Sequence, residues 1–197
     1  MKIEIKRIIN IFKKGGVIVC PTDTVYGLIA DAANKKAVEK VFKIKKRHKK
    51  KAIPIFVKDI KTAKKLAFIN KRQEKFLKKV WPGKITVVLK RKPNCGLPKI
   101  LFGGRKTIAL RIPNYKMVNN LLEKINKPLT GTSANISGKP ASAKIKEVLF
   151  QFKNQKLQPD LIIDVGNLKK SKPSKIIDLT KRKPKILRAI DKSKNIC

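Results

Sequence analysis

Polar side chains follow three predicted strands at the points where those strands end. The segments are residues 21–28 (Pro-Thr-Asp-Thr-Val-Tyr-Gly-Leu), 111–113 (Arg-Ile-Pro) and 130–138 (Thr-Gly-Thr-Ser-Ala-Asn-Ile-Ser-Gly). In open α/β sheets, ligands bind beyond strand ends, where hydroxyl, amide and guanidinium groups can hold carboxylates and phosphates. The same residue types also cap helices and close turns. Each segment alone is therefore equally consistent with ordinary turn chemistry.

A dense basic run at residues 45–51 (Lys-Lys-Arg-His-Lys-Lys-Lys) supplies charge that could neutralise phosphate. Such runs are loosely specific as motifs. This one follows a helical pattern and leads directly into a strand-like segment, residues 53–57. A sheet beside the run would hold some of these bases in fixed positions, so a phosphate chain is the ligand that we expect there.

Other routes to catalysis find no support in the sequence. The single histidine, His48, lies far from any cysteine, and the three cysteines form no CxxC pair. A zinc cluster and a Cys–His nucleophile pair are therefore not indicated, and we expect no metal held by protein side chains. No P-loop and no GxGxxG fingerprint are present. An odd cysteine number (Cys20, Cys95, Cys197) suits a reducing, cytoplasmic environment.

The charge of the chain predicts attraction to polyanions. Lys and Arg number 51 against 12 Asp and Glu, a formal net charge of +39. Such a field attracts nucleic acid at low salt and loses it as salt rises. Only eight of the bases are arginines and the lysines are spread over the whole chain, a pattern that favours compositional bias over a dedicated binding face. Non-specific RNA binding is the partner that charge alone predicts.

The strands and helices expected to position these groups indicate one domain over residues 1–197. Its class is α/β (α+β), with a twisted mixed sheet and flanking helices. No membrane span is expected, since the longest stretch without Lys or Arg, residues 15–34, carries Asp23 and Asp31. The hydrophobic patterns predict helices near the N-terminus and at 35–46, 59–68, 71–80, 115–125 and 142–152, and strands at 17–20, 53–57, 84–90, 107–112, 128–132, 160–165, 174–180 and 184–190.

Seven motifs in register resemble the YrdC-like threonylcarbamoyl-AMP synthases over residues 17–188. They are residues 21–28, Lys45-x-Arg47, 81–83 (Trp-Pro-Gly), 109–113 (Ala-Leu-Arg-Ile-Pro), 132–138 (Thr-Ser-Ala-Asn-Ile-Ser-Gly), Pro173-Ser174 before 176–178 (Ile-Ile-Asp), and Leu187-Arg188. The resemblance implies a basic cavity in a mixed sheet. It also implies an enzyme, a nucleotidyltransferase that makes threonylcarbamoyl-AMP and pyrophosphate from L-threonine, bicarbonate and ATP for the threonylcarbamoyladenosine modification of tRNA.

The same resemblance assigns roles to individual residues. Lys45 and Arg47 are the implied catalytic residues, positioned at the ATP phosphates. Threonine is expected at Thr24, Arg111, Ser133 and Ser174, and ATP at Arg47, Lys51, Thr107, Asn135 and Arg188. Arg111 suits a carboxylate through a bidentate pair. ATP enters as a substrate accompanied by Mg²⁺, for which no dedicated protein ligands are identified. The downstream partner is the machinery that transfers threonylcarbamoyl to tRNA.

The sequence departs from the family pattern at a few positions, and two alternatives stay open. His48 replaces a proline after Lys-x-Arg, Ala52-Ile53 replaces Pro-Leu, and Lys175 replaces a threonine after Pro173-Ser174. One alternative is a double-stranded RNA-binding or ribosome-maturation protein of the same fold; the other is the related YciO-like branch. Aromatic residues are only 6% of the chain, whereas an RNA-binding module needs stacking rings. The enzyme is therefore favoured over the RNA-binding protein as a hypothesis.

Overall fold

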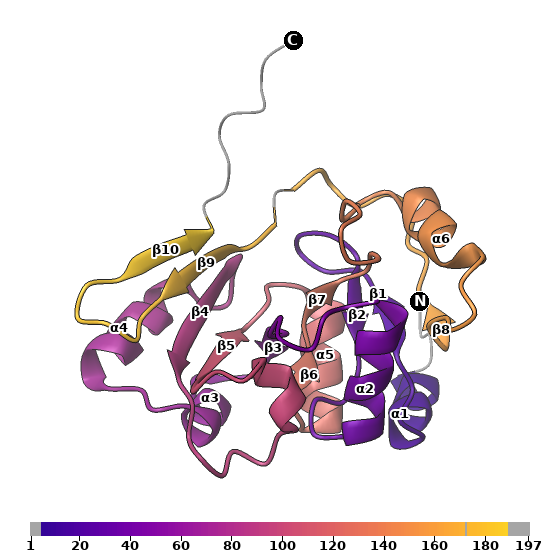
Figure 1. The fold of residues 1–197 in the computed structure, drawn as a ribbon. Coiled ribbons are helices and arrows are strands. Elements are labelled where there is room, and N and C mark those ends of the chain that lie inside the picture. Colours follow the sequence, from indigo (N-terminus) through magenta and orange to yellow (C-terminus); the bar gives the residue numbers. More distant parts are fainter. Residues whose placement is uncertain (1–4, 172, 189–197) are drawn as a thin grey trace.

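The computed structural model describes residues 5–171 and 173–188, which form six α-helices, one 3₁₀ helix and ten strands (Figure 1). The α-helices are α1 (Ile5–Lys13), α2 (Lys35–Ile44), α3 (Ile60–Leu66), α4 (Lys71–Val80), α5 (Lys116–Ile125) and α6 (Ile145–Lys153), and η1 spans Lys99–Phe102. The strands are β1 (Ile18–Cys20), β2 (Gly27–Ile29), β3 (Ile55–Phe56), β4 (Ile85–Lys90), β5 (Thr107–Arg111), β6 (Leu129–Thr130), β7 (Thr132–Ser133), β8 (Leu161–Ile162), β9 (Lys175–Asp178) and β10 (Lys185–Arg188).

These strands form two mixed sheets. One has the order β7-β2-β1-β8 and the other β10-β9-β4-β5-β3-β6. Both sheets are mixed: the pairs β1 with β8, β3 with β5 and β4 with β9 are parallel, and the other pairs are antiparallel. The chain passes from the larger sheet to the smaller at Gly131, between β6 and β7. The expected mixed α/β fold is thus present, with its strands divided between two adjoining sheets (Figure 1).

Helices cover both faces of the smaller sheet. Side chains alternate between the faces of a strand, and in β1 Ile18 and Cys20 belong to one apolar cluster while Val19 belongs to another. The first cluster includes Ile8 of α1 and Leu121 of α5. The second contains apolar residues of α2 and α6. This sheet is therefore closed on both sides.

The larger sheet has one closed face and one open face. Val87 and Leu89 of β4 pack in the core with α3 and α4, whose N-caps Asp59 and Asn70 accept hydrogen bonds from backbone N–H groups. The alternate residues of β4, Thr86 and Val88, point to the opposite face. On that face Val88 lines a cavity.

Most predicted elements are found, with shorter bounds. The segment 128–132 is divided into β6 and β7, and β2 was not predicted because residues 27–29 directly follow a turn and make a strand of three residues. Cys197, residues 1–4 and the end of the strand expected at 184–190 lie outside the described residues. Cys20 is buried and Cys95 half-buried, and both are free thiols.

Candidate active site

A cavity of about 350 Å³ lies between the open face of the larger sheet and the polar segments of the smaller one. Among the described residues, its lining includes four arginines and no acidic side chain. The lining includes Thr22, Thr24, Arg47, Phe56, Arg105, Arg111, Ser133, Ser174 and Arg188. A concave site lined by guanidinium and hydroxyl groups suits an anionic ligand.

Phe56 forms part of the cavity wall because Gly131 lets the chain pass over its ring. A Cβ atom built on Gly131 would lie 2.5 Å from the Phe56 ring, closer than any real contact. Glycine is therefore required at the crossing from β6 to β7. The Phe56 ring in turn lies 5.7 Å from the Arg111 guanidinium, within the range of a cation–π contact.

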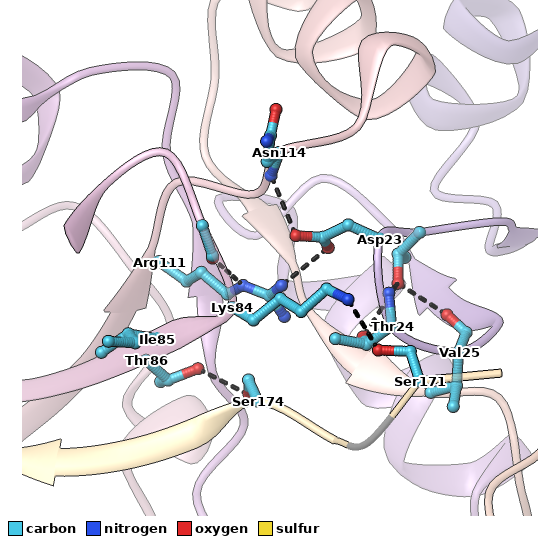
Figure 2. Close-up of polar contacts among 12 residues, drawn as sticks. Asp23, Thr24, Val25, Lys84, Ile85, Thr86, Arg111, Asn114, Ser171 and Ser174 are labelled. Carbon is cyan, nitrogen blue, oxygen red and sulfur yellow. Dashed lines mark hydrogen bonds and ion pairs between the residues drawn. The ribbon is translucent and has the colours of Figure 1, made fainter. Parts of the chain in front are cut away.

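Arg111, at the end of β5, is held on two sides (Figure 2). Its Nε donates to the Gly83 carbonyl at 2.8 Å, and its Nη2 donates to Asp23 Oδ1 at 2.6 Å. The two side chains of this ion pair are only 4% and 7% exposed. Asp23 Oδ2 also accepts from the backbone N–H of Asn114 at 3.0 Å. A carboxylate ligand can therefore meet only the end of the guanidinium, through Nη1 and the second N–H of Nη2.

The loop after β1 presents the hydroxyl of Thr24 to the cavity. Thr22 Oγ1 donates to the Val25 carbonyl at 2.6 Å and accepts from the Thr24 N–H at 3.1 Å. The two hydroxyl oxygens are 3.1 Å apart. Because the Thr22 proton is used on Val25, any proton shared between the hydroxyls comes from Thr24. Thr24 Oγ1 then keeps a lone pair for a donor in the cavity.

Ser174 and Arg188 form a second anchored group on the opposite wall. Arg188 donates to the Ser174 carbonyl through Nε at 3.0 Å and Nη2 at 2.7 Å. The Ser174 hydroxyl lies 3.0 Å from the hydroxyl of Thr86 on β4 (Figure 2). Both Ser174 and Thr86 are buried. The segment before β9 and the strand β10 thus place at the cavity a guanidinium that is held by Ser174.

The basic run after α2 separates into buried and exposed members. Lys46 has a positive φ of 48° and is exposed, and the turn it forms directs Lys45 and Arg47 inward. Arg47 lines the cavity and donates to the carbonyls of Lys51 (3.0 Å) and Ala52 (2.8 Å). Lys51 itself is exposed. One helix end therefore produces both a fixed guanidinium and a solvated surface.

Lys45 lies behind the cavity wall, 2% exposed. Its Nζ donates to the Ser133 carbonyl at 2.6 Å and to the Asn135 carbonyl and Oδ1 at 2.9 and 2.7 Å. Asn135 Oδ1 also accepts from the Ser133 hydroxyl at 2.6 Å. Three acceptors match the three N–H groups of an ammonium. Lys45 and Asn135 thus fix Ser133, which is the member of the group that lines the cavity.

Burial shifts the titration of the bases at this site. It lowers the pKa of Lys45 to about 7, with a further contribution from the Arg47 charge. Burial likewise lowers the pKa of Arg47 and Arg188. The pKa of Arg111 is lowered by burial and by Arg188, while Asp23 acts in the opposite direction. Burial thus disfavours the charged form of these bases, and an anionic ligand would offset that effect.

The structure brings most of the predicted site residues together, and several reach the cavity. Thr24, Arg47, Arg111, Ser133, Ser174 and Arg188 line it, and Lys45 and Asn135 lie directly behind Ser133. Thr107 is on β5, two and four residues before the lining residues Ala109 and Arg111, so it shares their face of the sheet beyond the lining. Lys51 contributes its carbonyl to Arg47 and does not line the cavity.

Sequence reasoning missed Asp23, Thr22 and Arg105. Asp23 and Thr22 lie within the polar segment 21–28, and an acid is a rare residue in a chain with only 12 of them. This scarcity of acids was the sequence signal that could have identified Asp23 as a site residue. Arg105 follows Gly103 and Gly104, both with positive φ, which turn the chain toward the cavity. Nothing in the local sequence distinguishes Arg105 from the other bases.

Fold and site together define a mixed α/β protein with an arginine-lined cavity at the meeting of two sheets. The comparisons with known proteins place it further: the family model of Sua5, YciO and YrdC, described as “Telomere recombination”, matches residues 10–189. The chain belongs to this family.

Several relatives are similar over most of this chain. A Methanocaldococcus jannaschii protein is 39% identical over 180 residues, which are 89% of this chain and 82% of that protein. A Psychromonas ingrahamii threonylcarbamoyl-AMP synthase is 30% identical, over 88% of this chain and 91% of its own. The Pyrococcus abyssi enzyme of that name is 33% identical over 89% of this chain, but this chain spans about half of its length, 51%.

Solved structures agree with the fold. P. abyssi Sua5 complexed with L-threonine superposes with a TM-score of 0.86 at 32% identity, covering 93% of this chain and 53% of that one. E. coli YciO gives a TM-score of 0.82 at 30% identity, covering 93% of this chain and 87% of that one. The fold is therefore common to both branches of the family that the sequence left open.

Over 5–171 and 173–188, no helix is both long and apolar enough to cross a bilayer. Over the same residues, no cluster of three or more His, Cys, Asp or Glu side chains is placed to hold a metal ion.

Proposed function

We propose that this protein is a threonylcarbamoyl-AMP synthase. The observation that carries the proposal is the cavity with two kinds of arginine: Arg111, paired with a carboxylate, and Arg47 and Arg188, held by carbonyl oxygens. The names of its relatives support the same reaction. In that reaction, the amine of L-threonine combines with bicarbonate to give a carbamate and water. The carbamate oxygen then attacks the α-phosphorus of ATP and pyrophosphate leaves, a nucleotidyl transfer.

Arg111 and Thr24 are suited to the amino acid. The end of the Arg111 guanidinium would take the carboxylate, and the free lone pair of Thr24 would accept from the amine. Ser133 and Ser174 would add hydroxyl contacts from opposite walls. The solved complex of P. abyssi Sua5 with L-threonine supports an amino acid as the ligand of this fold.

Arg47 and Arg188 are suited to the triphosphate. Phosphoryl-type transfer needs positioning and charge neutralisation more than a protein nucleophile, and guanidinium groups fixed by carbonyls supply both. Lys45 would act indirectly, through the position of Ser133, while Asn135, Thr107 and Lys51 would lie at the margins of the nucleotide. Because no carboxylate of residues 5–171 and 173–188 lines the cavity, Mg²⁺ would be held by the ATP phosphates.

We place the reaction in the cytoplasm, where ATP, bicarbonate and tRNA-modifying enzymes meet. The product is a mixed anhydride and must be taken by an acyl acceptor, which for this proposal is the tRNA threonylcarbamoyl-transfer machinery. Residues 17–188 would carry the activity as one domain.

The test is to incubate purified protein with ATP, L-threonine and bicarbonate. We expect pyrophosphate in equal amount to threonylcarbamoyl-AMP, with no product when threonine is omitted. Pyrophosphate release that needs no threonine, or none at all with folded protein, would contradict the proposal. The RNA-binding alternative is not favoured by the comparisons, and the same assay separates it, since a binding module gives no product.

A further inference from the structure

The cavity must hold two anionic ligands at once if the proposed function is right. A triphosphate and an amino-acid carboxylate both seek guanidinium groups, and the lining offers four of them. Phosphate carries more charge than carboxylate and competes better for any cation. Something must keep the phosphates off the arginine that serves the amino acid.

The arginines differ in their counter-charge. Arg47 and Arg188 donate to backbone carbonyls and to the Ser174 hydroxyl, so their positive charge remains to attract an anion. Arg111 donates to the carboxylate of Asp23, and both partners are more than nine-tenths buried. Water therefore screens this carboxylate poorly, and its field reaches the ligand position on Arg111.

We propose that Asp23 is a specificity-determining residue that reserves Arg111 for a zwitterionic amino acid by repelling phosphate from it. An anion bound at the end of the Arg111 guanidinium shares that group with the Asp23 carboxylate. A phosphate dianion there meets an unfavourable like charge, whereas an amino acid brings an ammonium that offsets it. Repulsion of the wrong ligand is a common source of specificity.

The geometry suits this role more than direct binding. Asp23 does not line the cavity, and both of its oxygens are occupied, Oδ1 by Arg111 and Oδ2 by the Asn114 N–H. Asp23 thus acts through its charge and through the placement of Arg111 (Figure 2). An asparagine of the same shape can keep the hydrogen bond from Arg111, but it loses the charge and the hydrogen bond from the Asn114 N–H.

The experiment is a calorimetric titration of the ATP-free protein with inorganic phosphate. We expect Asp23→Asn to bind phosphate at least tenfold more tightly than the parent protein, and we expect Arg111→Met in the same chain to abolish the gain. The matched control is Glu123→Gln, which removes one negative charge from an exposed position on α5 and should leave the affinity within twofold. An equal gain in the control, or no gain in Asp23→Asn, would overturn the proposal.

A second measurement uses the unaltered protein, so it does not depend on how the variant folds. Threonine affinity measured in saturating inorganic phosphate should stay within about threefold of its value without phosphate. Simple competition between the two would overturn the proposal. The phosphate titration needs neither threonine nor turnover, so a failure of the proposed synthase reaction is distinguished from a failure of charge selection at Arg111.

Discussion

The cavity and the surface of the basic run use the same residue types in opposite ways. Lys45 and Arg47 are buried or half-buried, and their nitrogens donate to named oxygens at 2.6 to 3.0 Å. Lys46, Lys49 and Lys50, from the same seven residues, are exposed. Fixed cations recognise a particular anion, whereas solvated cations produce a diffuse field. The place of a residue relative to the turn at Lys46 therefore determines whether its cation is fixed or solvated.

The largest expected difference between the exposed lysines and the cavity is in how strongly salt weakens ligand binding. If the exposed lysines contact six to ten RNA phosphates, raising salt from about 50 to about 200 mM should weaken RNA binding by about 10³- to 10⁵-fold. Threonine affinity, measured with ATP present, should change only a few-fold because the cavity contacts are short and enclosed. Fluorescence anisotropy and calorimetry measure the two. An RNA hairpin that stays tightly and selectively bound across this range would mean that the surface holds a specific RNA site.

Arg47 and Lys46 are sequence neighbours whose substitutions we expect to differ strongly in their effect on catalysis. Arg47→Ala removes a fixed guanidinium from the cavity and should lower kcat/KM by about 30-fold, which is about 2 kcal/mol of transition-state stabilisation. Lys46→Ala removes an equal charge from the exposed side and should change kcat/KM less than twofold. Steady-state kinetics with ATP varied decides this. Equal losses would mean that the run acts only through its field.

How far the sequence predicts these differences depends on distance along the chain. Local patterns predicted α1, α2 and α4 because apolar spacing and caps are local. The division into two sheets rests on pairings such as Ile18 with Leu161, which no local pattern encodes. The strand β2 was missed for the same reason, since β1 and β7 on either side of it define it.

At the site, the sequence predicts which residues matter better than what each one does. The resemblance to the family identified Lys45 and Asn135, but only the structure places them behind Ser133, in contact with each other. Arg111 was predicted to offer a bidentate fork. Asp23, 88 positions away in the chain, occupies part of it. Pairings of this length depend on the fold, so composition and spacing cannot predict them.

A substitution of Thr24 tests the contact that we propose between this hydroxyl and the amino acid. Thr24→Val keeps the shape of the side chain and removes the hydroxyl, so the KM for threonine should rise about tenfold, the effect of one hydrogen bond to a charged group. The KM for ATP should change less than twofold, and the melting temperature should hold within about 2 °C. Large destabilisation with normal threonine affinity would show that the hydroxyl serves the turn, together with Thr22, and not the ligand.

Lys45 gives the smallest expected effect, a pH dependence of stability. Its pKa of about 7 in the folded protein lies below the value of about 10.4 in an unfolded chain. Between these values the unfolded chain binds more protons, so this residue makes the free energy of unfolding rise with pH, by on the order of 1 kcal/mol per pH unit. Below pH 7 the cost of the buried charge is fully present and constant.

Urea unfolding of the parent protein, Lys45→Met and Lys46→Met at pH 7, 8 and 9 isolates this contribution, because the other titrating groups are common to all three. We expect the parent to gain stability relative to Lys45→Met as pH rises and to run parallel to Lys46→Met, whose side chain is exposed in the native state. Parallel curves for all three proteins would mean that the three oxygen acceptors around Nζ hold the Lys45 proton as firmly as water does. Lys45 would then belong, energetically, with the solvated lysines despite its burial.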